Sequence, residues 1–178
     1  MAQLLESRGI DYVAWQNRAF WFYVAARALY FSTLYAPAAF NSTQSLELLL
    51  KATLKYHNRR FSPTEVGHRF SSMLRALKQR VPGGDQVAIP AYFRDRRYQS
   101  ISRYPHPTSG LVVPATFIPD LDTVFTSLIG LVPFQHNTEL RKTLRKSGTA
   151  IHEHLIRSNA SLPALAHLLG ETLTLPTA

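Results

Sequence analysis

The sequence predicts an all-α protein, an up-and-down antiparallel bundle of about five helices. Three observations support this class. Apolar residues recur at helical spacing over most of the chain, strand-like alternation is nearly absent, and Pro, Gly or helix-capping residues separate the helical segments. We expect one helical domain over residues 1–158, followed by a short helix and a tail over residues 159–178. A chain of 178 residues buries enough apolar surface to fold without disulfides, and this chain has no Cys.

The first expected helix runs from about Asp11 to Tyr35, with Asp11 as its N-cap. The segment of residues 19–40 is rich in aromatic side chains and carries one formal charge, Arg27, near its middle. A charged residue at the centre of a membrane-spanning helix costs roughly 2.5–3.5 kcal/mol. We therefore expect this helix to be buried in the bundle or against a second copy of the chain, and not to span a membrane.

The next two helices have clear sequence signals at their ends. Pro37 is suited to the start of a helix that should reach His57. The capping-box sequence Ser62-Pro63-Thr64-Glu65 then begins a helix with an apolar stripe from Val66 to Val81. Pro82-Gly83-Gly84 should end it, so we expect one continuous helix between these two signals.

The remaining half of the chain is expected to hold shorter helices around a Pro-rich loop. The loop covers residues 107–119, and the helices are expected over residues 86–104, 119–131, 137–158 and 161–170. Asp120 and Asp122 lie at a helix start, where acidic side chains complement the helix dipole. This structural role is the simpler interpretation of the two acids, and we expect no metal site there.

Positive charge is concentrated in one third of the chain. Residues 51–103 contain 12 of the 20 Lys and Arg residues and 3 of the 11 Asp and Glu residues, a net charge of +9 that equals the formal charge of the whole chain. The sequence pI is about 10.2. These values favour a polyanionic partner, such as RNA, nucleotide phosphates or an acidic protein, over a generally basic surface.

Several residues in this basic third are candidates for binding phosphates or bases. Arginines and aromatic residues alternate near residue 100, a pattern that suits stacking on bases and contacts with phosphates. The same pattern also fits a bundle helix whose aromatic rings face the core. The candidate binding residues are Lys51, His68, Arg94, Arg97, Arg103 and Tyr104. For His68, a purely structural role remains an alternative.

A second pattern points to a catalytic pair. Arg145 and His152 are seven residues apart, which places them on one face if a single helix carries both. An Arg that holds a phosphate and a His that moves a proton are the minimal parts of metal-free RNA cleavage by the 2′-hydroxyl. The sequence lacks the common nucleotide-binding and metalloprotease motifs, and His152 and His154 are poorly spaced for chelation. We therefore expect neither a metal nor another cofactor.

Three motifs together resemble one known family, the HEPN domains (higher eukaryotes and prokaryotes nucleotide-binding). TQSLELLLKATL places Gln44, Glu47 and Lys51 in the family's Q-x-x-E-x-x-x-K arrangement. GHRFSSMLRAL places His68 on the His of the family's next helix, and YQSISRYP resembles the family's Y-x-x-x-R-Y-P stretch, with Arg103 on its Arg. The order and spacing of the motifs fit over residues 11–106.

The resemblance implies a helical bundle that is usually a homodimer. The family includes metal-independent ribonucleases, many of them toxins of toxin–antitoxin systems, with an R-x(4–6)-H motif. It also includes non-catalytic members that bind nucleotides or pair with small nucleotidyltransferases. Here no R-x(4–6)-H occurs near Arg103, although six residues separate Arg145 from His152.

Two functional hypotheses follow from the residues and the resemblance. The first is a cytoplasmic homodimer that binds RNA or nucleotides, either without catalysis or as a metal-independent endoribonuclease. The alternative is a non-catalytic interaction subunit that partners a nucleotidyltransferase or another acidic protein. The absence of Cys and of a signal-peptide pattern is the basis for expecting the cytoplasm.

Overall fold

The computed structural model describes residues 2–95, 98 and 111–172, and these residues form helices and connecting segments without a strand. This result confirms the predicted all-α class. In these residues the helices are α1 (Ala2–Phe31), α2 (Tyr35–His57), α3 (Pro63–Val66), α4 (Phe70–Arg80), α5 (Ala91–Arg94), α7 (Phe117–Ile129), α8 (Glu139–Arg145), α9 (Ala150–Ile156) and α10 (Leu162–Leu169).

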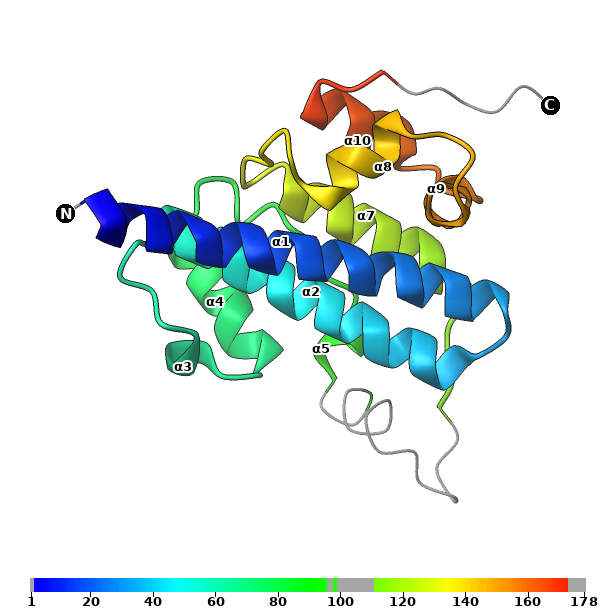
Figure 1. Ribbon diagram of the computed structural model, residues 1–178. Coiled ribbons are helices and arrows are strands. Elements are labelled where there is room, and N and C mark those ends of the chain that lie inside the picture. Colours follow the sequence, from blue (N-terminus) through cyan, green and yellow to red (C-terminus); the bar gives the residue numbers. More distant parts are fainter. Residues whose placement is uncertain (1, 96–97, 99–110, 173–178) are drawn as a thin grey trace.

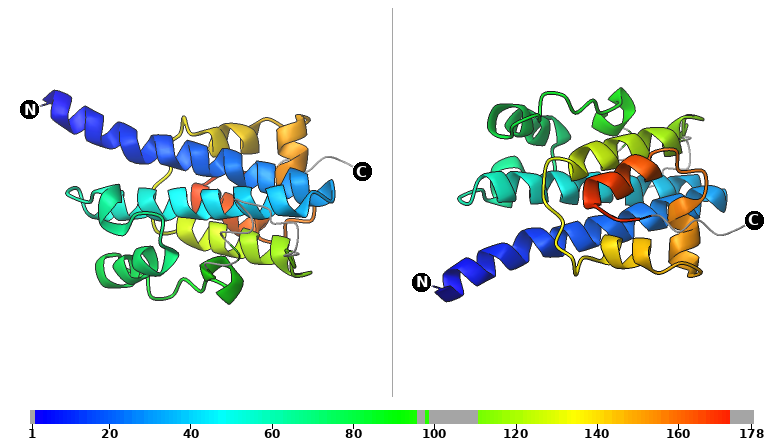
Figure 2. Two further views of the ribbon diagram at one scale, coloured as in Figure 1. Left: turned by 90° about the horizontal axis from the view of Figure 1, so that it is seen from below. Right: turned by 90° about the horizontal axis from the view of Figure 1, so that it is seen from above.

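The two longest helices, α1 and α2, form an antiparallel hairpin at the centre of the fold (Figure 1). Helices α4 and α7 pack on α2, α8 and α9 pack on α1, and α10 packs on α7. Figure 2 shows that α7 runs alongside the hairpin, whereas α9 lies across its end. Fully buried side chains from both helices of the hairpin and from α7, including Phe20, Leu46, Leu50 and Phe125, form the core between them.

A tight turn joins α1 to α2. Helix α1 begins at Ala2, so Asp11 is an interior residue and not the predicted N-cap. The helix ends at Phe31, where the Leu34 N–H donates to the Leu29 carbonyl and the Thr33 N–H donates to the Tyr30 carbonyl. This pattern is a Schellman motif, and Thr33 takes the left-handed conformation that the motif requires, with φ of 62°.

The single charge in the middle of α1 is neutralised inside the protein. Arg27 is fully buried and donates two hydrogen bonds to the Asp122 carboxylate of α7. Its Nε donates to the carbonyl of His154, and its Nη2 donates to the carbonyl of Arg157, at the end of α9. Asp122 therefore compensates the charge of Arg27, which is a different structural role from the helix-dipole contact that its position in the sequence predicts. Among the described residues, no helix is long and apolar enough to cross a membrane.

Two of the predicted long helices are each divided in the structure. The expected helix after Ser62 is interrupted at Gly67, and the expected helix over residues 137–158 is interrupted at residues 146–149. In both breaks a glycine has a positive φ, 55° at Gly67 and 77° at Gly148, which favours glycine over residues with a Cβ. These breaks partly explain why about five helices were predicted and more are observed.

The expected helix over residues 86–104 is also different from the observed structure. Residues 86–90 are not helical, and α5 begins only after Pro90. Proline disfavours helical backbone in the residue before it and lacks the N–H that a helix interior needs. Most of the remainder of that expected helix lies outside the described residues.

Candidate functional site between α2 and α4

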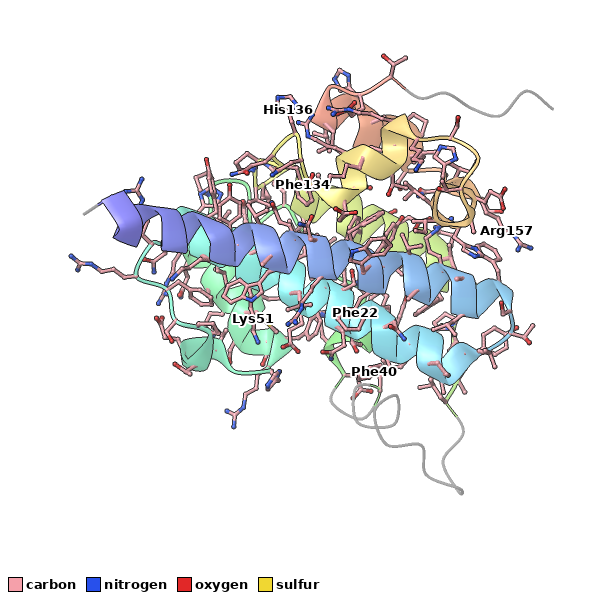
Figure 3. All side chains as sticks on the ribbon, in the orientation of Figure 1. Phe22, Phe40, Lys51, Phe134, His136 and Arg157 are labelled. Atoms are coloured by element: carbon pink, nitrogen blue, oxygen red, sulfur yellow. The ribbon has the colours of Figure 1, made fainter. Side chains whose placement is uncertain are left out.

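A buried acid on α2 holds two basic side chains where α2 meets the loop between α3 and α4. Glu47 is only 3% exposed. Its Oε1 accepts a hydrogen bond from Lys51 Nζ at 2.8 Å and lies 2.7 Å from Nδ1 of His68. Lys51 follows one turn later on the same helix and is also buried, and Figure 3 shows it on the side of the hairpin where α4 lies. We call these three residues the Glu47 cluster.

Local backbone structure brings His68 to this cluster. The Glu65 carboxylate accepts a hydrogen bond from the Ser62 N–H at 2.8 Å, which fixes the start of α3. Gly67 then turns the chain with φ of 55° and ψ of −131°, so that α3 ends and His68 lies in the loop before α4. If α3 and α4 formed one continuous helix, His68 would be an interior residue of that helix and not a loop residue. The interruption is therefore what allows it to reach Glu47.

The contact with Glu47 gives the His68 ring a defined orientation. A neutral imidazole whose Nδ1–H donates to a carboxylate presents an unprotonated Nε2 on its other side. The His68 side chain is 70% exposed, so solutes can approach this nitrogen. A carboxylate that orients an imidazole in this way is a common element of general-base sites. The cluster is suited to contact an anion when His68 is protonated and to accept a proton when His68 is neutral.

Several exposed basic residues follow His68 in the sequence. Arg69 directly follows His68, and Arg75 and Lys78 are one turn apart on the exposed face of α4. Arg80, at the end of α4, pairs with Glu65 at 3.2 Å. The face formed by the loop at residues 67–69 and the exposed side of α4 therefore presents several positive charges and one local ion pair. We call it the α4 face.

A groove of about 580 Å³ lies between α1 and α2. Its lining comes from four residues of α1 and three of α2: Arg18, Trp21, Phe22, Ala25, Asn41, Gln44 and Leu48. Figure 3 shows Phe22 near the middle of the hairpin, with Lys51 farther along α2. Gln44 belongs to the same polar stripe of α2 as Glu47 and Lys51, so the groove and the Glu47 cluster are neighbours along that helix.

The other predicted binding residues are less informative. Arg94 is exposed at the end of α5. Arg97, Arg103 and Tyr104 lie outside the described residues. Tyr98 is buried, and burial raises the pKa of its hydroxyl, so this aromatic side chain contributes to the core and does not offer an open stacking surface.

The predicted catalytic pair is not carried by one helix. Arg145 is the last residue of α8, and His152 lies on α9 after the break at residues 146–149. Arg145 is exposed and donates to both oxygens of Glu171, at 2.8 and 2.6 Å. His152 is 1% exposed, and its Nε2 has no hydrogen-bond partner among the residues that the structure describes. The shared helical face is therefore wrong, and a catalytic role for the two residues stays a prediction.

No group of three or more His, Cys, Asp or Glu residues is arranged to hold a metal ion in the part of the chain that the structure describes. The Glu47 cluster itself offers a carboxylate, an ammonium and an imidazole.

A comparison with protein families identifies the family to which the chain is similar. The family model described as the HEPN domain matches residues 12–118. The chain belongs to the HEPN domain family. The matched part of this HEPN chain contains all of α2 and the whole Glu47 cluster, and membership supports a role related to nucleotides or RNA. Comparisons with curated proteins and with solved structures gave no match.

Sequence reasoning identified two members of the Glu47 cluster as binding residues but did not identify its centre. Lys51 and His68 were candidates, whereas Glu47 was only part of a motif. The spacing of Glu47 and Lys51 at i and i+4 is a signal for their ion pair. The groove was missed, although Arg18, Trp21 and Ala25 recur at i, i+3 and i+7 on α1, as groove-lining residues on one helical face do.

Proposed function

We propose that this HEPN protein binds RNA or nucleotide phosphates on the α4 face, with His68 at the edge of the binding surface. The observation that carries the proposal is the exposed His68 ring held by the buried carboxylate of Glu47. The net charge of +9 over residues 51–103 provides the long-range attraction for a polyanion. Membership in the HEPN family supports the same class of ligand.

The contacts suggest different roles for the predicted binding residues. Lys51 is 7% exposed and bonded to Glu47, so we assign it to positioning that carboxylate and not to direct phosphate contact. His68 and the neighbouring Arg69 are exposed and are the first candidates for phosphate contact. Arg75 and Lys78 extend the positive surface along α4.

A charge-reversal experiment tests this proposal. The binding of a fluorescently labelled single-stranded RNA is measured by anisotropy at several salt concentrations, for the wild-type chain and for Arg75→Glu/Lys78→Glu. We expect weaker binding and a smaller salt slope, by about 0.7 for each phosphate that the variant no longer neutralises. The matched control is Lys142→Glu/Lys146→Glu, which changes the net charge equally on exposed residues around the end of α8.

The outcomes separate the possible surfaces. Equal losses in both double variants would mean that only net charge matters, and that result would overturn a localised α4 face. Absence of binding to RNA and to nucleotides in the wild-type chain would overturn the proposed function as a whole. An acidic partner protein that displaces RNA from the α4 face would identify the interaction-subunit alternative. Light scattering would measure whether the chain forms the predicted homodimer.

A second candidate function, metal-independent RNA cleavage, is favoured by the orientation of His68. In this reaction the 2′-oxygen attacks the adjacent phosphorus and the bond to the 5′-oxygen breaks. The ring takes the 2′-hydroxyl proton, and a protonated group supplies one to the leaving 5′-oxygen. RNA cleavage that resists EDTA and is lost in His68→Ala would support this assignment. His152→Ala tests the sequence-based pair, and His106→Ala, at the histidine three residues after Arg103 in the sequence, is the further control.

A further inference from the structure

We propose that the groove between α1 and α2 is a nucleobase site that holds one base of a nucleotide or RNA strand against Trp21. The inference deepens the proposed function, on which it rests, by assigning the base to the groove, the phosphate of the same nucleotide to Arg18, and further phosphates of an RNA strand to the α4 face.

The walls of the groove suit a flat aromatic ligand. The Trp21 side chain is 42% exposed, although it packs against the buried ring of Phe20 with centroids 5.5 Å apart. The indole thus contacts a core side chain while Trp21 remains partly exposed. Phe22, Ala25 and Leu48 supply the rest of the apolar lining. The volume of about 580 Å³ lies within the range of about 300–1,000 Å³ that is usual for small-ligand sites.

Two side-chain amides give the groove the means to read a base edge. The Asn41 Nδ2 donates to the Pro37 carbonyl at 2.7 Å, which fixes its amide and leaves Oδ1 as an acceptor. Gln44 lines the same groove three residues later and is half-buried. An amide carries both donors and an acceptor, the groups that pair with base edges. One fixed amide and one adaptable amide therefore face a space with aromatic walls.

The charge of the lining selects the class of occupant. Arg18 is exposed, and the other lining residues are uncharged, so the groove has a positive charge and no acid. A second copy of the chain placed symmetrically over the groove would bring two Arg18 side chains into one interface without an acid from the lining between them. A nucleotide instead provides a planar base for Trp21 and a phosphate for Arg18.

The position of the groove also agrees with the proposed phosphate surface. Gln44 and Glu47 are three residues apart on α2, a rise of about 4.5 Å along the helix axis. A base in the groove therefore lies close along α2 to the Glu47 cluster, from which His68 leads to the α4 face. One strand of RNA would be able to use both surfaces.

Intrinsic fluorescence provides a direct test. The chain has two Trp residues, so Trp15→Phe leaves Trp21 as the single reporter. In this variant we expect saturable quenching by AMP, GMP, CMP or UMP.

Calorimetry provides a second test. In a chain with no other substitution, Trp21→Leu should weaken nucleotide binding about tenfold or more, because stacking on the base is removed. Gln44→Leu should change the preference among bases.

The charge variant has its own expected signature. Arg18→Gln should weaken binding of the monophosphates more than binding of the corresponding nucleosides, because only the former carry the group that Arg18 contacts. Lys142→Gln, on an exposed side of α8, is the matched control and should leave both unchanged. Circular dichroism of each variant establishes that the helical fold is retained.

Four results would decide the inference. Loss of nucleotide binding in the Trp21 and Arg18 variants would support it. Unchanged binding in these folded variants would overturn the groove while leaving the proposed function in place, since the α4 face is tested separately by Arg75→Glu/Lys78→Glu. A dimer that Trp21→Leu converts to a monomer would show that the groove is covered by a second copy, and would also overturn it. Absence of any nucleotide or RNA binding would overturn both proposals.

Discussion

At the scale of single residues, Arg27 and Asp122 form a buried ion pair that joins α1 to α7. Both side chains are buried, and Tyr23 donates a further hydrogen bond to Asp122 at 2.6 Å. Burial raises the pKa of the Tyr23 hydroxyl well above its ordinary value, so this group stays protonated and remains a donor. Asn159 in turn donates to the Tyr23 oxygen at 2.9 Å. Two side chains of α1 thus depend on one side chain of α7 and on Asn159, which follows α9.

Removal of one partner from this network should be costly. Asp122→Ala leaves the Arg27 guanidinium buried without its counter-charge, and we expect a loss of about 3–5 kcal/mol in the free energy of unfolding. Urea unfolding would measure it. The double variant Arg27→Met/Asp122→Leu removes both charges and should lose much less. Arg80→Gln, in an exposed ion pair, is the control and should change little. A small loss in Asp122→Ala would contradict the role given to the pair.

Glu171 should make stability depend on pH in the acid range. Hydrogen bonds from Arg145, with further contributions from Arg141, lower the pKa of the Glu171 carboxyl from 4.5. A carboxyl whose pKa is lower in the folded state stabilises the fold above its unfolded pKa, and this contribution is lost as the pH falls through the folded pKa. Glu171→Gln should therefore be less stable than the wild-type chain at pH 7, and the difference should disappear near pH 2. Urea midpoints at both pH values measure it.

At the scale of elements, the sequence predicts where most helices lie but not where two of them break. The ends of α2 and α10 agree with the predicted helices to within two residues, because the residues near Pro37 and Gly170 are strong local signals. The stripe from Val66 to Val81 is equally clear, yet the helix breaks at Gly67. Hydrophobic periodicity reports which side of a segment is buried, and a short break between α3 and α4 leaves that pattern almost unchanged.

The break at Gly67 also explains why the candidate site was only partly predicted. Glu47 and His68 are 21 residues apart, and their contact requires the loop that the break creates. The spacing of apolar and polar residues within one segment contains no information on that tertiary contact. Arg145 and His152 illustrate the opposite error, since their spacing implies a shared face only if Gly148 continues the helix.

Substitution of Gly67 should disturb the site more than its size suggests. Apart from Gly67 and its two chain neighbours, no atom of the described residues lies within 4 Å of the position that a Cβ would take, so Gly67→Ala meets no clash there. Its φ of 55° combined with ψ of −131° is nevertheless a backbone conformation that alanine rarely adopts, and it costs an alanine on the order of 1–3 kcal/mol. We expect that loss in urea unfolding, together with weaker RNA binding as His68 moves away from Glu47. Gly148 also has a positive φ and lies far along the chain, so Gly148→Ala should lose stability without losing RNA binding.

For the molecule as a whole, the HEPN match covers fewer residues than the set of helices that pack together. The match ends at residue 118, two residues into α7. Yet α7 packs on α2, and α8 and α9 pack on α1. Hydrogen bonds also cross the predicted boundary at residue 158, because Asn159 donates to Tyr23 and Arg141 donates to Glu171. The division into residues 1–158 and 159–178 stays a prediction, but these contacts join the second part to α1 and α8 of the first.

A truncated chain would test whether the matched segment is stable alone. A chain of residues 1–118 lacks Asp122, so Arg27 would be buried without its partner or would have to reach solvent. It also lacks most of α7, which exposes the apolar side of α2 that α7 covers. We expect this chain to lose cooperative thermal unfolding and near-ultraviolet circular dichroism, whereas a chain ending at residue 172 should retain both. Cooperative unfolding of the shorter chain would mean that α1 to α5 form an independent domain. The Arg27–Asp122 pair would then join two units, and the loss predicted for Asp122→Ala would be confined to their contact.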